Sequence, residues 1–319
     1  MSSPAAASAP TAEPHATLRA CLLMIASAIF FGLMAITIRF ASAQLHPFQI
    51  AFFRSLFGAV FALPLVVVHG LTILRTRRIG FYFLRCAVGM GSMLAAFWAM
   101  VHLPLAQAIA LSYSTPLFVT IGAVLVLGEI VRMRRWSAVV IGFIGVLVIV
   151  RPGAATFTAA SLVPLIAAAL SGSVTISIKY LARSEHPDTI VLLTTLLWVP
   201  LSLPAALPVW QTPQPGIWPW LVLAGLCGTG GHYCWTRALK LADASLIAPI
   251  SYVQLLIVAV LAWWLFGEGV DRYTAIGAAI IIGASIYIAQ REASLARQRR
   301  RVSIAATGEA VVAPTQPRP

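Results

Sequence analysis

Long hydrophobic runs separated by short polar linkers make up most of the chain and set its fold class. A helix that crosses a bilayer needs about 20 predominantly apolar residues. Ten stretches come close to that requirement, and prolines, glycines and charges gather between them. The pattern predicts an all-α integral membrane protein with ten transmembrane helices. The predicted helices cover residues 18–40, 47–69, 79–101, 104–128, 135–151, 160–182, 188–208, 216–239, 243–266 and 273–290.

Charged residues add an orientation. With the helices laid out alternately, most of the 22 basic residues fall on the side that holds both chain ends, and only Arg39, Arg151 and Arg272 lie on the other. Cytoplasmic loops carry the excess of Lys and Arg, so both termini are expected in the cytoplasm. The net charge of +13 does not predict a nucleic-acid partner, because the basic residues are scattered between apolar runs.

The second half of the sequence repeats the first at an offset of about 140 residues. Chance could match apolar positions, but not several distinctive dipeptides at one spacing. The matched dipeptides are His46-Pro47 with His186-Pro187, Ser112-Tyr113 with Ser251-Tyr252, and Gly128-Glu129 with Gly267-Glu268.

The repeat predicts four segments along the chain. Residues 17–151 and 152–291 form two five-helix repeats, between disordered tails at 1–16 and 292–319. An odd number of helices per repeat makes the second enter the membrane from the opposite side. Such inverted repeats are typical of secondary transporters, whose solute site lies near the bilayer midplane between the halves.

These features resemble the EamA-type ten-helix carriers of the drug/metabolite transporter superfamily. The resemblance rests on the two five-helix halves, the Gly-Glu pairs that end the fourth and ninth helices, Pro116 inside the fourth, and glycines in the fifth and tenth. In the ninth helix Leu255 replaces the proline. The resemblance covers residues 18–290. It implies a central cavity lined by helices 1, 3, 4, 6, 8 and 9, and solutes ranging from amino acids to drugs and nucleotide-linked metabolites.

The eighth predicted helix carries the most informative polar cluster. Thr229, His232, Tyr233 and Thr236 share one helical face, and Trp235 lies beside them after a glycine-rich stretch. Polar groups in membrane helices are functional candidates by default, so these residues are interpreted as a wall of the solute site. The alternative is helix–helix packing, with glycines at the interface.

Symmetry singles out Ser112, Tyr113, Ser251 and Tyr252, at equivalent positions of the fourth and ninth helices; Gln254 lies one turn from Ser251. They suit a site between the halves, although their hydroxyls could instead bond back to their own helices.

Met93 and Trp98, in the third helix, offer soft aromatic surface to a solute. Such residues are more often packing groups than ligands, and both interpretations stay open.

Four charged residues need a partner. A buried Arg54 or Arg85 could bind a carboxylate solute. Arg85 is nevertheless expected to extend to the cytoplasmic interface, and Arg54 to meet backbone carbonyls or the outer interface. Glu129 and Glu268 sit at helix C-termini, where a carboxylate is disfavoured. Nearby arginines, Arg272 for Glu268, are expected to compensate.

The predicted function is secondary transport of small metabolites across the bacterial inner membrane, with amino acids, aromatic or neutral, as the leading solutes and aromatic amino-acid exporters as the general type. Multidrug carriers and lipid or other-metabolite carriers of the same fold are the alternative. No catalytic or metal-binding spacing occurs within the helices, so an enzyme, a metal and a cofactor are not expected. The expected partners are the solute and the lipid bilayer, with the protein a monomer or weak dimer.

Overall fold

The computed structural model describes residues 14–69, 76, 78–127, 133–151, 158–181, 187–241, 248–287, 290 and 294. Every regular element within these ranges is a helix, so the all-α prediction is confirmed for them. The long helices are α1 (Pro14–Ala41), α2 (Pro47–His69), α3 (Ile79–His102), α4 (Leu105–Ser112), α5 (Thr115–Leu127), α6 (Met133–Val150), α7 (Val163–Leu181), α8 (Pro187–Ala206), α9 (Trp218–Leu241) and α11 (Val253–Phe266). The remaining elements are four short 3-10 helices, η2 (Ala159–Leu162), η3 (Leu207–Val209), η4 (Pro215–Ile217) and η5 (Ala248–Tyr252), and a last helix, Arg272–Tyr287.

Six helical stretches in the described ranges are long and apolar enough to cross a membrane, and three shorter ones are also apolar. The six are Leu18–Ala41, Pro47–Pro64, Ile79–His102, Leu105–Gly122, Ala159–Ser177 and Thr189–Val209. Large apolar side chains on the outside of the bundle fit this setting. Leu147 on α6 and Trp263 and Trp264 on α11 are more than half exposed, which water would disfavour and lipid tails accept.

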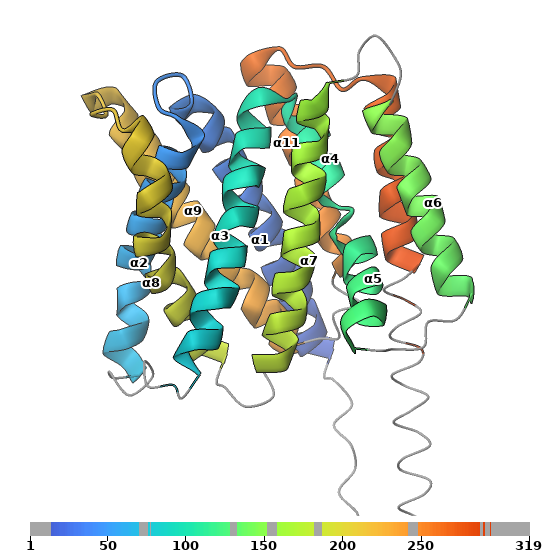
Figure 1. Cartoon of the computed structure of the whole chain (residues 1–319), viewed down its shortest axis with the longest axis horizontal. Helices are drawn as coiled ribbons and strands as arrows, with labels where there is room; N and C mark the ends of the chain where they lie inside the picture. Colours follow the sequence, from blue (N-terminus) through green and yellow to red (C-terminus); the bar gives the residue numbers. More distant parts are fainter. Residues whose placement is uncertain are drawn as a thin grey trace, which may run out of the picture.

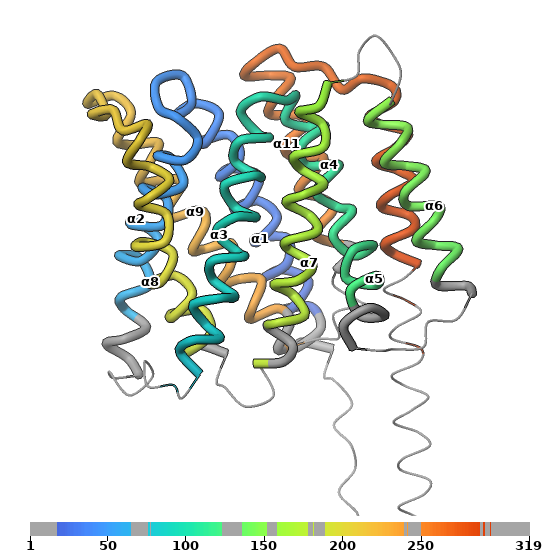
Figure 2. Tube along the Cα trace, viewed as in Figure 1, coloured from blue at the N-terminus to red at the C-terminus, as the bar shows by residue number. Residues whose placement is uncertain are grey.

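The helices stand side by side in one bundle (Figure 1), in which distant parts of the chain pack together. α1 lies along α9, α2 along α8, and α3 along α7. α1 also contacts α11, and α5 contacts α7. The trace in Figure 2 shows the same interleaving, with the blue and teal helices of the first half among the yellow and orange ones of the second. Each half therefore depends on the other to bury its helices.

The fourth predicted membrane helix is broken in its middle, which corrects the continuous helix expected there. α4 ends at Ser112, a turn follows, and α5 begins at Thr115. Pro116 explains the break, because proline lacks the N–H that would bond to Ser112 and its ring clashes with that carbonyl. The hydroxyls of Ser112, Ser114 and Thr115 each donate to a carbonyl three residues back.

The ninth predicted helix changes its winding at the equivalent point. The 3-10 helix η5 ends at Tyr252, and α11 continues from Val253. The symmetry-related dipeptides Ser112-Tyr113 and Ser251-Tyr252 thus both lie where the helix is interrupted. Non-helical backbone at membrane depth is tolerated where it is buried in protein or lines a water-filled cavity.

The start of α1 and the two Gly-Glu pairs can be compared with the sequence predictions. α1 begins at Pro14, a little earlier than the tail boundary at residue 16 predicts. The remaining tail residues, and Gly128-Glu129 of the first Gly-Glu pair, lie outside the described residues. The second pair is described: Gly267 has a φ of 68°, a left-handed conformation that ends α11 and that glycine adopts without strain.

The backbones of α6 and the last helix meet through two glycines. A Cβ on Gly277 would lie 2.6 Å from the carbonyl oxygen of Gly145 and would also collide with Ile149. A Cβ on Gly145 would lie 2.9 Å from the carbonyl oxygen of Gly277. Small residues permit such close approach of membrane helices.

Substituting one of these glycines should separate the two helices. We expect Gly277→Ala to lower the free energy of unfolding by about 1–3 kcal/mol, the usual cost of overpacking. Unfolding of the protein in detergent micelles measures the change. Gly283→Ala, in the same helix with open space around it, is the matched control and should leave stability near that of the wild type. Equal stability of the two variants would contradict the close contact.

Candidate functional site

Arg54 projects from α2 into the interior of the bundle, with 4% of its surface exposed. Its Nη1 lies 3.6 Å from the sulfur of Met93, and its guanidinium carbon lies 5.2 Å from the centre of the Trp198 ring. Gly228 on α9 makes the space, since a Cβ there would lie 2.5 Å from Nε of Arg54. The expectation that Arg54 meets backbone carbonyls or the outer interface is therefore wrong, because its side chain contacts Met93 and Trp198 inside the bundle.

Arg85 is also buried, with 6% of its surface exposed. Its Nη1 donates a hydrogen bond of 2.6 Å to the hydroxyl of Thr194 on α8. That hydroxyl in turn donates a hydrogen bond of 2.5 Å to the backbone carbonyl of Ile190. The expected extension to the cytoplasmic interface is wrong, because α8 covers the side chain.

His232 and Trp198 complete the interior group. The His232 ring packs edge-on against Phe31 at 5.1 Å and against Trp198 at 6.1 Å between ring centres. Thr194, which accepts from Arg85, lies one turn from Trp198 on α8. The Nε atoms of both arginines and the indole N–H of Trp198 are buried without a hydrogen-bond partner among the described residues. We call Arg54, Arg85, Trp198 and His232 the interior cationic group.

The other candidates of the eighth predicted helix do not join this group. Thr229 donates to the Gly58 carbonyl at 3.1 Å, which ties α9 to α2, and Thr236 bonds back to the His232 carbonyl at 2.8 Å. Tyr233 is 42% exposed and lies under the guanidinium of Arg237. Trp235 packs with a separate apolar cluster that includes Met24 of α1.

The two symmetry-related tyrosines do meet. The rings of Tyr113 and Tyr252 pack edge-on at 4.8 Å, and the Tyr113 hydroxyl donates to the Ser251 carbonyl at 3.2 Å. Ser112 bonds back to its own helix, as its structural interpretation expected. Gln254 is half-buried, and its amide makes no hydrogen bond within the described ranges. The interruption points of α4–α5 and η5–α11 are therefore in direct contact.

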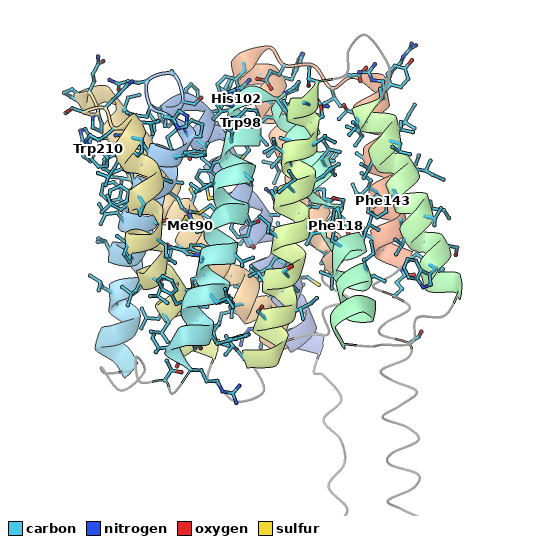
Figure 3. The ribbon with its side chains drawn as sticks, in the orientation of Figure 1. Met90, Trp98, His102, Phe118, Phe143 and Trp210 are labelled. Atoms are coloured by element: carbon cyan, nitrogen blue, oxygen red, sulfur yellow. The ribbon has the colours of Figure 1, made fainter. Side chains whose placement is uncertain are left out.

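The two candidates of the third predicted helix separate. Met93 belongs to the interior, against Arg54. Trp98 stacks on His102 at 4.1 Å, and Figure 3 shows both at the upper end of α3. Partial burial lowers the pKa of the nearby His46 imidazole, and the charge of His102 lowers it further by a smaller amount. Trp98 thus sits at the membrane edge, away from Arg54.

Trp198 and Thr194 are site residues that sequence reasoning missed. Both lie in α8, within an apolar stretch that no motif marks. Their partners lie on α2, α3 and α9, which are distant in the sequence, so only the folded structure identifies Trp198 and Thr194 as site residues.

An ion pair closes one end of the bundle. Glu268, just after α11, accepts hydrogen bonds from the guanidinium of Arg39 on α1 and, at 2.8 Å, from the backbone N–H of Leu105 on α4. Arg39 also donates to the carbonyls of Met100 and Val101 on α3. The expected partner of Glu268, Arg272, instead contacts Tyr273. That expectation is wrong because the left-handed Gly267 turns the chain back across the bundle.

The two halves of the chain each match one family model. Residues 18–151 and residues 158–290 match the model described as the EamA-like transporter family.

Several curated proteins are similar over most of the chain. A riboflavin transporter of Vibrio cholerae is 32% identical over 294 residues, which cover 91% of this chain and 99% of the relative. An S-adenosylmethionine uptake transporter of Rickettsia prowazekii is 31% identical, over 80% of this chain and 86% of the relative. A solved structure aligns with a TM-score of 0.61 at 20% identity, over 85% of this chain and 98% of the other, and shows the fold alone.

The Arg39–Glu268 pair should contribute measurably to stability. We expect Glu268→Gln to lower the free energy of unfolding by about 1–3 kcal/mol, because a neutral amide cannot replace a carboxylate that accepts from a guanidinium and a backbone N–H. Asp271→Asn is the matched control. Its carboxylate pairs with Arg151 at 3.1 Å but is more exposed, so its loss should cost at most about 0.5 kcal/mol. Unfolding in detergent measures both; a larger loss for Asp271→Asn would refute the role given to Glu268.

Proposed function

Because the chain belongs to the EamA-like transporter family, we propose that it is a secondary transporter that carries a small organic metabolite across the bacterial inner membrane by alternating access. In this proposal ten helices cross the membrane, both termini are cytoplasmic, and residues 17–151 and 152–291 form two inverted repeats.

The pairing of the helices supports the inverted repeat. If the halves are exchanged, the contact of α1 with α9 becomes that of α7 with α3, and the contact of α1 with α11 becomes that of α7 with α5; all four contacts exist. The pairing of α2 with α8 maps onto itself. A pseudo-twofold arrangement of this kind gives two near-equivalent states that open to opposite sides.

The Arg39–Glu268 pair supports closure of one side in this state. It joins α1, α3, α4 and α11, elements of both halves, at the end of the bundle where α1 finishes. The matching residues of the inverted repeat are Lys179 and Glu129, whose side chains lie outside the described residues. In our proposal one pair closes each side in turn.

Flavins are the solute class that we propose first. The observation that carries this choice is the interior cationic group: the aromatic rings of Trp198 and His232 beside buried N–H donors that have no partner among the described residues. A flat, carbonyl-rich ring offers stacking surface and acceptors together. The similarity to a riboflavin transporter points the same way. S-adenosylmethionine fits less well, because its sulfonium cation would face two buried arginines.

Amino acids remain the second candidate, in line with the expectation from sequence. The observation in their favour is that a buried guanidinium without a protein carboxylate suits a solute carboxylate.

Counterflow in proteoliposomes tests the proposed function. Vesicles loaded with unlabelled riboflavin should take up labelled riboflavin well above protein-free vesicles, because exchange needs only alternating access. Parallel loading with phenylalanine and with S-adenosylmethionine should give weaker uptake of the corresponding label. Absence of riboflavin exchange, with active exchange of either other solute, would overturn the flavin proposal.

His232 should matter to transport rather than to insertion. We expect His232→Ala to slow riboflavin exchange about tenfold, the effect of losing roughly 1.4 kcal/mol of interaction, while the amount of protein in the membrane stays unchanged. Thr236→Val, one turn away, is the matched control: its hydroxyl bonds only to the His232 carbonyl. Normal exchange by His232→Ala would return the ring to a packing role.

A further inference from the structure

Arg54 and Arg85 are two formal positive charges inside the bundle, and neither has a counter-charge among the side chains that the structure describes. In the described part of the chain the ion pairs are Arg39–Glu268 and Arg151–Asp271, and neither arginine of the interior takes part. None of the nine acidic residues of the sequence lies in the middle of a predicted membrane helix. Buried charges in proteins are normally paired or bound to a ligand.

The contacts that these arginines do make are weak substitutes for an anion. A thioether sulfur is a poor acceptor, and the Met93 sulfur and the Trp198 ring face are what Arg54 contacts. Arg85 has the Thr194 hydroxyl, which also donates to a carbonyl, and the thiol of Cys86, which is a weak acceptor. A guanidinium has five N–H donors, and the Nε–H of each arginine is buried without a partner among the described residues.

Two contacts on α8 link the two arginines. Trp198 contacts Arg54 directly, and Thr194, the partner of Arg85, lies one turn away on the same face of α8. The Nε of each arginine and the indole nitrogen of Trp198 are buried without a hydrogen-bond partner among the described residues. N–H donors beside two positive charges are complementary to a group rich in oxygen and negative charge.

Gly228 provides the room that the Arg54 side chain occupies. An alanine Cβ at Gly228 would lie 2.5 Å from Nε and 2.8 Å from Nη2 of Arg54. Glycine at this position therefore lets the guanidinium of Arg54 lie close to the α9 backbone.

We propose that Arg54 and Arg85, with the indole N–H of Trp198, bind an oxyanion, a carboxylate or phosphate, carried by the transported solute next to its aromatic ring. The inference rests on the proposed function, because it names the class of solute that this interior site takes. It extends that function from neutral flavins to anionic ring compounds.

Matched solutes test the inference on the purified full-length protein in lipid nanodiscs, by isothermal titration. Riboflavin is compared with riboflavin 5′-phosphate and with 10-(carboxymethyl)flavin, which separates phosphate from carboxylate. Indole-3-acetate and indole-3-acetamide pose the same question without a flavin. We expect the anionic member of at least one pair to bind about tenfold more tightly than its neutral partner, since a desolvated charge pair is lost in the neutral compound. Equal affinities within every pair would overturn the inference.

Substitutions locate the effect. Arg54→Met and Arg85→Met should reduce the anion preference to about onefold, whereas Arg237→Met, which removes a guanidinium from the exposed face of α9, should keep it. Gly228→Ala should displace the Arg54 guanidinium without removing it. This variant tests the same site if a methionine variant fails to fold. A preference that survives all three interior variants overturns the assignment. So does inorganic phosphate alone competing as strongly as riboflavin 5′-phosphate, because the site would then bind a free ion.

The two proposals fail separately. Riboflavin exchange in proteoliposomes without any anion preference would overturn this inference and leave the flavin carrier intact. An anion preference in the indole pair, lost in the Arg54 and Arg85 variants, with no riboflavin exchange, would support the oxyanion site and overturn the flavin proposal.

Discussion

Inside a bilayer every backbone N–H and C=O must find its partner within the protein, and the rest of this structure depends on that requirement. It makes long helices the default, and it makes each interruption costly. The break at Tyr113 is tolerated because Ser112, Ser114 and Thr115 supply hydroxyls to the carbonyls that the break affects. While they do this, the same hydroxyls have no proton left to donate to a solute. The polar residues of the fourth helix thus support the backbone, and the tyrosine rings beside them make the contact between the halves.

Charge inside the bundle follows a different rule from charge at its ends. At the end, Arg39 and Arg151 each have a carboxylate partner. In the interior, Arg54 and Arg85 have none among the described residues. An isolated carboxylate or guanidinium in low dielectric costs several kcal/mol even after relaxation, so two such groups in the interior point to a functional role. The burial that makes them expensive also makes them sensitive to what a solute brings.

Much of the architecture could be predicted from sequence because it rests on periodic and local signals. Apolar runs of membrane length gave the helices, and paired dipeptides such as Ser112-Tyr113 and Ser251-Tyr252 led to the contact between Tyr113 and Tyr252. Pro116 was visible, and its effect on the fourth helix follows from proline chemistry alone.

The candidate site was harder to predict from the sequence than the fold. His232 lies in the interior, but Tyr233, its neighbour in sequence, faces outward. A helical face can be computed from spacing, whereas the side of the helix that meets the core depends on its neighbours. Trp198 carries no signal in its own stretch, and Arg85 was expected at the interface because the covering helix α8 is more than 100 residues away in the chain.

The single carboxylate of Glu268 holds α1 and α4 against the end of α11, and through Arg39 it also engages α3. Because these bonds share one anchor, the helices cannot part from it one by one at little cost; losing the anchor releases them together. In the closure that we propose, an end of the bundle that opens in one step is rarely partly open. For a protein embedded in an energised membrane this matters beyond its own solute, since a passage ajar at both ends would let ions through and dissipate the gradient on which the cell depends.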